Sequence, residues 1–335
     1  MTVPEFRGSG PIPGYTPPAP RAGLAALTDP EGYEASAPLV RAVRVALALN
    51  MPLLLTGEPG TGKTQLAYRL AAELGLGEPL RFDTRSSSQA NDLFFSFDTM
   101  RYFAQSQISA ARDEALPEPR EFVRYESLGE AIVRTWPREE VANLLPSGFP
   151  DYVPGRSLVL VDEIDKAPRD FPNDLLNQIE NLEFSVPELR GAPLRVRPPD
   201  PDDPGRPELR PVVVITSNSE KQLPEPFLRR CVYHHIEFPE DRIPTIVAAR
   251  LKDLPLDSPG FEGARQFFFA LRDRGAGLAK KPSTSELLDW LRALRGEGLK
   301  ADVPFQEQRE LAGHCLGTLA KTEADVTLAR KLLLR

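Results

Sequence analysis

The stretch that decides the fold reads Gly-Glu-Pro-Gly-Thr-Gly-Lys-Thr at residues 57–64. It fits the eight-residue pattern of glycines, a lysine and a hydroxyl residue that cradles phosphate groups. Residues 53–56 before it form a short apolar run suited to a buried strand, and apolar residues recur at helical spacing after it until Gly75. A strand, a glycine-rich loop and a helix are the setting that this pattern requires, so the sequence predicts a phosphate-binding loop.

Each residue type in the loop has a chemical task; the alternative is a glycine-rich turn of purely structural use. Glycines allow backbone angles at which successive amide N–H groups point into one concavity and bind phosphate oxygens. Lys63 carries a positive charge to the outer phosphates, and the Thr64 hydroxyl is suited to ligate Mg²⁺. ATP is favoured over GTP because no Asn-Lys-x-Asp guanine signature follows the loop. The predicted ATP-binding residues are Gly57, Glu58, Pro59, Gly60, Thr61, Gly62, Lys63, Thr64 and Gln65.

Composition indicates a soluble globular protein of the cytoplasm. The 335 residues are 41% hydrophobic, and the chain has neither an apolar run long enough for a membrane span nor an export signal at its N-terminus. Cys231 and Cys315 are too few for a disulfide framework and are predicted to be buried free thiols. His234, His235 and His314 are predicted to be structural. The net charge of −7 disfavours broad binding of nucleic acid.

Strand and helix patterns alternate through the first two thirds of the chain, which predicts an α/β fold with a parallel sheet covered on both faces. The predicted strands are residues 53–56, 80–83, 158–161, 212–216 and 233–238, with a helix over 37–49 before the first. After Pro239 only helical patterns remain, over residues 243–251, 261–273, 284–295, 306–320 and 323–334. The predicted domains are a flexible Pro/Gly-rich arm (1–28), a nucleotide-binding core (29–239) and a helical lid domain (240–335).

Two long stretches, residues 90–155 and 185–211, interrupt this plan. The first is predicted to hold helices near 101–115 and 128–136, and the second, rich in proline, suits a hairpin. Both can be partner-binding segments or solvated insertions, since long loops in a compact domain are often functional. Phe94, Phe95 and Phe97 in the first stretch favour core packing over a substrate grip.

Acidic residues follow a second buried strand. Leu158–Val161 is followed by Asp162, which can hold Mg²⁺, and by Glu163, which can orient and deprotonate an attacking water. The strand over 212–216 ends in Ser217-Asn218, where the Asn218 amide can bind the water or the terminal phosphate. Its structural alternative is a turn, which Asn also favours. The sequence therefore predicts a hydrolytic site at the carboxyl edge of the sheet.

These motifs together resemble the AAA+ ATPases, with GEPGTGKT as Walker A, LVLVDE as Walker B and TSN as sensor 1. The runs VDEIDKAPRDFPNDLLNQIE and ITSNSEKQLPEPFLRRC resemble the MoxR-like branch in particular, and the resemblance covers about residues 35–295. It implies a five-stranded parallel sheet of order 5-1-4-3-2 followed by a small all-helical lid. It also implies a homo-oligomer, a hexameric ring, and a protein client that carries a von Willebrand factor A domain.

The resemblance gives roles to further residues. The family places an arginine just before the last core strand, where it reaches a neighbouring subunit's ATP; by that spacing Arg230 is the better candidate, with Arg229 next. Both could instead be surface charges. The lid helix of many relatives begins with a sensor 2 arginine, whereas residues 280–287 here read KKPSTSEL and have none. Lys281 and Thr284 are the candidates to contact phosphate in its place.

The sequence thus predicts a Mg²⁺-dependent ATPase that remodels or activates a protein partner. One alternative is a signalling switch in which ATP binding sets assembly and slow turnover serves as a reset. A second is a motor on nucleic acid, which the acidic charge balance disfavours. The C-terminal residues Leu332–Arg335 either dock a partner or, as we favour, pack on the lid.

Overall fold

The computed structural model describes residues 6, 7, 9, 29–149, 152–189, 193–197, 209–218, 223–251, 255 and 257–334. Two compact units divide the chain, and each is described by itself. The first contains Ala35–Thr56 and Lys63–His235. The second contains Ile236–Arg335 together with two short segments, Gly32–Glu34 and Gly57–Gly62. Most of the phosphate loop therefore groups with the C-terminal helices.

The first unit is built on a five-stranded sheet of order β2-β5-β8-β1-β9. Numbered along the chain, this is the order 5-1-4-3-2 that the sequence predicts. The β2–β5, β5–β8 and β8–β1 pairs are parallel. Its strands are β1 (Leu53–Gly57), β2 (Leu80–Asp83), β5 (Leu158–Asp162), β8 (Val212–Ser217) and β9 (Val232–Ile236). The prediction that the last strand reaches residue 238 is wrong, because the Phe238 ring packs against the Arg272 guanidinium in the second unit instead.

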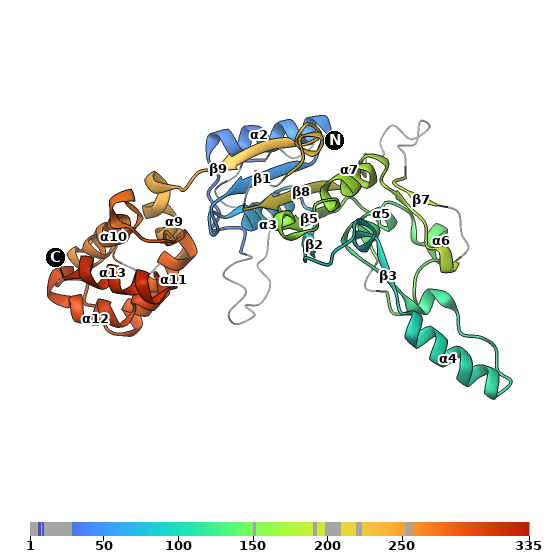
Figure 1. Ribbon diagram of the computed structural model, residues 1–335. Helices are drawn as coiled ribbons and strands as arrows, with labels where there is room; N and C mark the ends of the chain where they lie inside the picture. Colours follow the sequence, from blue (N-terminus) through green and yellow to red (C-terminus); the bar gives the residue numbers. More distant parts are fainter. Residues whose placement is uncertain are drawn as a thin grey trace. The chain divides into compact units, whose positions relative to one another are not determined.

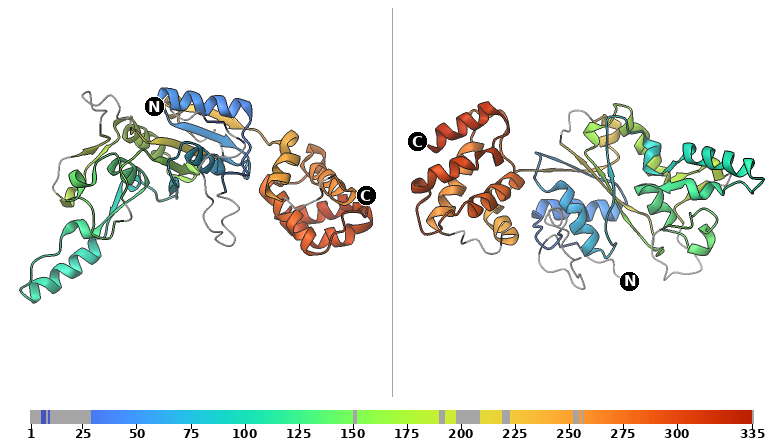
Figure 2. Two further views of the ribbon diagram at one scale, coloured as in Figure 1. Left: turned by 180° about the vertical axis from the view of Figure 1, so that it is seen from behind. Right: turned by 90° about the horizontal axis from the view of Figure 1, so that it is seen from below.

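Helices cover both faces of the sheet (Figures 1 and 2). Helix α2 (Ala37–Leu49) is capped at its start by Ser36, whose hydroxyl accepts from the Leu39 N–H, and at its end by Asn50, which has a left-handed conformation. The others are α3 (Lys63–Glu73), α5 (Ser127–Val133) and α7 (Phe171–Asn181). Strands β1, β5 and β8 are buried along their whole length, as their uninterrupted apolar runs require. The core of one face joins alternate strand residues, such as Leu54, Val159 and Ile215, to α5 and α7.

In the stretch predicted as an insertion over residues 90–155, the described residues 90–149 and 152–155 include an antiparallel pair of strands. Its elements are η1 (Ala90–Leu93), β3 (Phe95–Phe97), α4 (Thr99–Ala111), η2 (Pro119–Phe122), β4 (Val123–Tyr125), α5 and α6 (Arg138–Val141). Core packing of the phenylalanines is confirmed: Phe94 is buried, its ring lies 5.2 Å from that of Phe184, and Phe95 and Phe97 pack against the same core. Helix α4 extends away from these strands (Figures 1 and 2), with Met100 and Phe103 exposed.

The hairpin predicted for the second stretch begins two residues before it: β6 (Glu183–Phe184) pairs antiparallel with β7 (Leu194–Arg195), and only β7 lies within residues 185–211. Residues 190–192 and 198–208 lie outside the described residues. Most of the predicted N-terminal arm also lies outside them, but Phe6 is buried, and its carbonyl oxygen accepts hydrogen bonds from the Arg44 guanidinium.

Helices alone form the rest of the second unit, as predicted. They are α9 (Ile243–Arg250), α10 (Pro259–Arg272), α11 (Thr284–Gly296), α12 (Arg309–His314) and α13 (Glu323–Leu333), around a core that contains Trp290, Phe267 and Phe268. The single helix predicted over 306–320 is wrong: short turns η7 (Phe305–Gln308) and η8 (Leu316–Thr318) flank α12. Gly313 and Gly317 weaken a continuous helix there. None of the described helices is long and apolar enough to cross a membrane.

Candidate functional site

The phosphate loop has the backbone conformations that its glycines predict. Gly57, Gly60 and Gly62 all have positive φ, at 147°, 76° and 92°. A side chain at Gly57 would meet the Ile236 carbonyl oxygen at 2.5 Å, so glycine is required there for space as well as for conformation. Within the loop, the Thr61 hydroxyl donates to the Glu58 carbonyl oxygen at 2.9 Å.

After the loop, Lys63 begins α3 and is buried, and Gln65 is half-buried on the same helix. The Thr64 hydroxyl donates to the Asp162 carboxylate, 3.0 Å from Oδ1. A hydroxyl and a carboxylate oxygen at this separation are the hard ligands that Mg²⁺ prefers. The predicted metal ligands are therefore side by side.

Asp162 ends β5 at the carboxyl edge of the sheet, and it is 5% exposed. Besides Thr64, its carboxylate accepts from the Thr216 hydroxyl at 2.5 Å and pairs with the Arg81 guanidinium at 2.9 Å. Partial burial lowers the pKa of Arg81, but the charges of Asp162 and Asp83 outweigh it and raise the pKa overall. Sequence reasoning gave neither residue a role, because Arg81 is part of no motif and Thr216 was quoted only as the first residue of the TSN motif.

Glu163 has a strained backbone directly after β5, with φ 56° and ψ 51°. A left-handed conformation costs a non-glycine residue on the order of 1–3 kcal/mol, and such strain gathers at functional sites. The Glu163 N–H donates to the Thr216 hydroxyl at 2.9 Å, so Thr216 links the two acidic residues. The Glu163 side chain, 42% exposed, pairs with Lys166, and this hydrogen bond and charge raise the pKa of Lys166.

Asn218 lies beside Glu163, with its amide Nδ2 3.4 Å from Glu163 Oε1. Its backbone N–H donates to Asp165 Oδ1 at 3.0 Å, and the Ser217 hydroxyl donates to the same oxygen at 3.2 Å. Asp165 therefore ties the end of β8 to the turn that carries Glu163. The sequence signal for Asp165 was its position as a third acidic residue, two residues after Glu163.

The two candidate arginines follow the short helix α8 (Glu225–Leu228) and are exposed. Arg230, 44% exposed, pairs with Glu180 of α7 at 2.5 Å. Arg229 pairs with Glu225, one helical turn before it. Neither arginine contacts Asp162, Glu163 or Asn218 among the interactions given for the described residues.

In the second unit, the two candidates for the sensor 2 role differ. Lys281 is exposed, whereas Thr284 is buried at the start of α11, and its hydroxyl has no hydrogen-bond partner. The arginine that does reach the phosphate loop is Arg272, which donates to Glu58 Oε2 at 2.8 Å. No motif points to Arg272, because its helix precedes the segment where the family pattern places an arginine.

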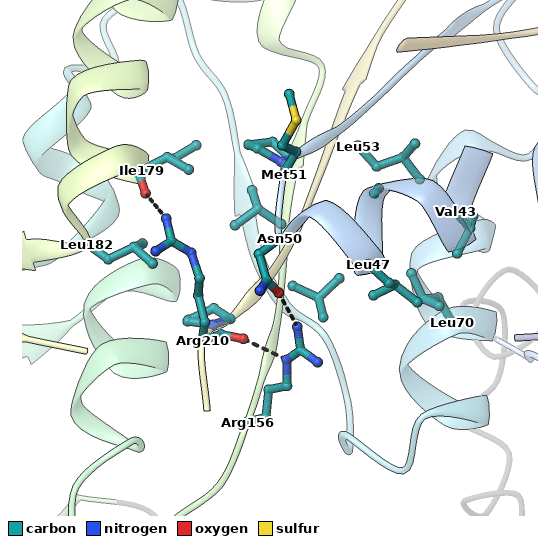
Figure 3. Close-up of a pocket in the computed structure, with 15 residues that line it drawn as sticks. Val43, Leu47, Asn50, Met51, Leu53, Leu70, Arg156, Ile179, Leu182 and Arg210 are labelled. Atoms are coloured by element: carbon teal, nitrogen blue, oxygen red, sulfur yellow. Dashed lines mark hydrogen bonds between the residues drawn. The ribbon is translucent and has the colours of Figure 1, made fainter. Parts of the chain in front are cut away.

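A cavity lies at the opposite, amino end of the strands (Figure 3). Arg156 and Arg210 line it, and their guanidinium groups donate to the Arg210 and Ile179 carbonyl oxygens. The second bond ties the segment before β8 to α7. The residues that line the cavity include none of the predicted site residues.

The chain resembles known proteins both in sequence and in fold. Residues 52–231 match the AAA domain (dynein-related subfamily). Among solved structures, a single-residue mutant of RuvB from Thermotoga maritima has a TM-score of 0.43 at 15% identity, covering 83% of this chain and 67% of that one. A second RuvB mutant has a TM-score of 0.43 at 14% identity, and the match covers 83% of this chain and 66% of that one. A katanin structure has a TM-score of 0.35 at 14% identity, and the match covers 84% of this chain and 77% of that one.

No curated protein matches the chain. The solved structures are too distant to carry an argument about activity. The domain match, in contrast, spans more than half of the chain and includes the phosphate loop, both acidic residues and Asn218. The chain therefore belongs to the AAA domain family, dynein-related subfamily, within the nucleotide-binding P-loop AAA+ superfamily.

Proposed function

We propose that the protein is a Mg²⁺-dependent ATPase of the MoxR-like branch, which hydrolyses ATP in the cytoplasm as a homo-oligomeric, hexameric ring. The observation that carries this proposal is the set of contacts around Asp162, because it joins the loop hydroxyl of Thr64 to the strand that carries Glu163. A phosphate cradle alone only binds a nucleotide. A carboxylate base beside it can also activate water.

Each residue has a role in the proposed reaction. The loop amides and Lys63 bind the phosphates, and Thr64 and Asp162 hold Mg²⁺, which neutralises charge on the phosphate oxygens. The Glu163 carboxylate accepts the proton of the attacking water, and the Asn218 amide orients that water or the terminal phosphate. Arg230, with Arg229 as the second candidate, stabilises charge on the ATP of a neighbouring subunit.

In this proposal, the energy of ATP hydrolysis drives the remodelling of a protein partner. The expected partner carries a von Willebrand factor A domain. Support comes from the MoxR-like sequence runs at residues 161–180 and 215–231. Helix α4 adds an extended, partly apolar surface, with Met100 and Phe103 exposed. Exposed apolar side chains of this kind often mark interaction sites.

One observation favours the switch as a second candidate. The Glu163 carboxylate is paired with Lys166, and Asp162 with Arg81, so both acidic groups are engaged by cations of their own chain. Such pairing suits slow basal turnover. Slow turnover together with a large ATP-dependent change in particle size, measured by light scattering, would favour the switch over the remodelling ATPase.

Glu163→Gln tests the hydrolytic role. The amide keeps the shape of the side chain but cannot accept the proton, so we expect normal ATP binding and turnover at least about a hundredfold slower. Turnover is measured by phosphate release and binding by equilibrium titration. Glu310→Gln, at an exposed position of α12, is the matched control and should turn over ATP normally. Near-normal turnover of Glu163→Gln would remove Glu163 from the mechanism.

A further inference from the structure

Arg272 is a buried cation at the last position of α10, with its side chain 6% exposed. One guanidinium nitrogen donates to the Pro282 carbonyl oxygen at 2.5 Å, and the other donates to Glu58 Oε2 at 2.8 Å. The guanidinium carbon lies 3.3 Å from the centre of the Phe238 ring, which provides a favourable cation–π contact. These contacts fix the guanidinium in one place.

Glu58 is the second residue of the phosphate loop, and the loop residues Gly57–Gly62 belong to the same compact unit as α10. A second contact supports this grouping. A side chain at Gly60 would lie 2.6 Å from Ser283 Cβ and from Ser285 Oγ, so the start of α11 touches the loop backbone closely. The helices therefore contact the loop at two successive points, Glu58 and Gly60.

The two partners of the Arg272–Glu58 ion pair do not depend on each other equally. A buried guanidinium is stable only when it is paired and hydrogen-bonded, and Glu58 is the carboxylate that pairs with it among the described ion pairs. The Arg272 Nε is buried and has no hydrogen-bond partner. Arg272 therefore depends strongly on Glu58, whereas Glu58 is 49% exposed and can be solvated without it.

We propose that Arg272 is a positioning residue for nucleotide binding: through its ion pair with Glu58 it holds the phosphate loop in the conformation that binds phosphates. The proposal rests on the proposed function, since it assumes that this loop binds ATP. It also gives the helical unit a link to the loop that does not require an arginine at the start of α11. Without this link the loop backbone moves more freely. Part of the binding free energy of the nucleotide is then used to order the loop, and the affinity falls.

A double-mutant cycle tests the proposal on the full-length protein. Arg272→Met keeps the length and apolar packing of the side chain but removes the charge and the donors. We expect it to weaken binding of a fluorescent ADP analogue about tenfold while kcat at saturating ATP changes less than about threefold. In a Glu58→Gln background the same substitution should change binding less than about threefold, because coupled residues are not additive. A purely stabilising role would instead give equal losses in both backgrounds.

Two controls keep the outcomes distinct. Arg265→Met, on the same helix and paired with exposed Glu262, should leave nucleotide binding unchanged. Arg272→Lys, which keeps the charge without the planar fork, should restore part of the binding; if Arg272→Met does not fold, this variant replaces it in the cycle.

The proposal is overturned if the substitutions at Arg272 leave binding unchanged or weaken it equally in both backgrounds. Lys63→Ala separates this failure from that of the proposed function. If the wild-type protein and Lys63→Ala bind the analogue alike, the loop is not the nucleotide site. If only Lys63→Ala loses binding while the Arg272 variants do not, the site stands and the positioning role of Arg272 falls.

Discussion

The carboxyl edge of the sheet and the arginine segment after α8 are the two regions to which we assign roles in hydrolysis, and their environments are opposite. At the edge, the Asp162 carboxylate is buried and receives three donors from its own chain. In the arginine segment, Arg230 is 44% exposed and has Glu180, itself half exposed, as its ion-pair partner. The edge is organised by one chain, whereas the arginine is held only loosely.

Because the two regions differ in burial, breaking their contacts requires different amounts of free energy. Removing one partner from a buried hydrogen-bonded carboxylate costs on the order of 1–3 kcal/mol or more, because the remaining group stays desolvated. An exposed ion pair contributes only about 0–1 kcal/mol. Arg230 can therefore leave Glu180 at little cost, as its proposed role toward a neighbouring subunit requires, whereas the contacts of Asp162 hold it in place.

The largest effect on turnover is expected at Arg230. Arg230→Ala should bind ATP normally but lower kcat by about a thousandfold, since an arginine supplied to the terminal phosphate is worth about 10³ to 10⁵ in rate in other nucleotide hydrolases. Phosphate release from the assembled protein is the measurement. Arg292→Ala, which removes an equally exposed arginine paired with Asp289, is the matched control.

Mixed assemblies show whether Arg230 acts on a neighbour. Arg230→Ala subunits retain Glu163, and Glu163→Gln subunits retain Arg230, so one class of shared site in a mixture is complete. We expect partial recovery of turnover when the two inactive variants are mixed. If no mixing ratio restores activity, Arg230 does not act on a neighbouring subunit and is a surface charge.

Part of the fold and of the candidate site could be predicted from the sequence, and part could not. Strands β1, β5 and β8 were predictable because their residues are uninterrupted apolar runs, and Thr64, Asp162 and Glu163 because fixed motifs carry them. The roles of Thr216, Arg81 and Arg272 were not, since each depends on which residue the fold brings beside it. Phe238 illustrates the limit: its pattern continues a strand, but its ring packs against Arg272.

A smaller effect is expected at Thr216, the residue that makes the edge a single unit. Thr216→Val removes the hydroxyl that donates to Asp162 and accepts from the Glu163 N–H. We expect kcat to fall about tenfold, because the loss of one buried hydrogen-bond partner costs about 1–3 kcal/mol and loosens the placement of Glu163. Thr216→Ser retains the hydroxyl and should recover most of the rate. Equal rates for Val and Ser would show that the hydroxyl does not organise the edge.

Lys166 sharpens the comparison, because its ion pair with Glu163 is the loosely held contact at the otherwise fixed edge. Both side chains are about half exposed. Lys166→Ala frees the Glu163 carboxylate, so basal kcat should rise about twofold to threefold, as expected for an exposed pair worth up to about 1 kcal/mol. Lys166→Arg retains the pair and should match the wild-type rate. A lower kcat for Lys166→Ala would mean that Lys166 supports the base rather than restrains it.

The last prediction concerns Cys231, directly after Arg230, and leaves turnover aside: it tests whether the exposed arginine lies on a rigid backbone. Burial raises the pKa of the Cys231 thiol to about 12, from an ordinary value of 9.0. At pH 8 the native thiol should therefore react with a disulfide reagent far more slowly than the unfolded chain, because the thiolate is the reactive form. Cys315→Ala isolates this thiol for the measurement. Rapid labelling at pH 8 would show that the segment opens readily, in which case Arg230 moves with its backbone and not by its side chain alone.

The same burial makes the stability of the protein depend on pH. Above pH 9 the Cys231 thiol ionises in the unfolded chain but not in the native protein, so the free energy of unfolding should fall from pH 9 to about 12. Below pH 9 the free energy of unfolding should be insensitive to this group.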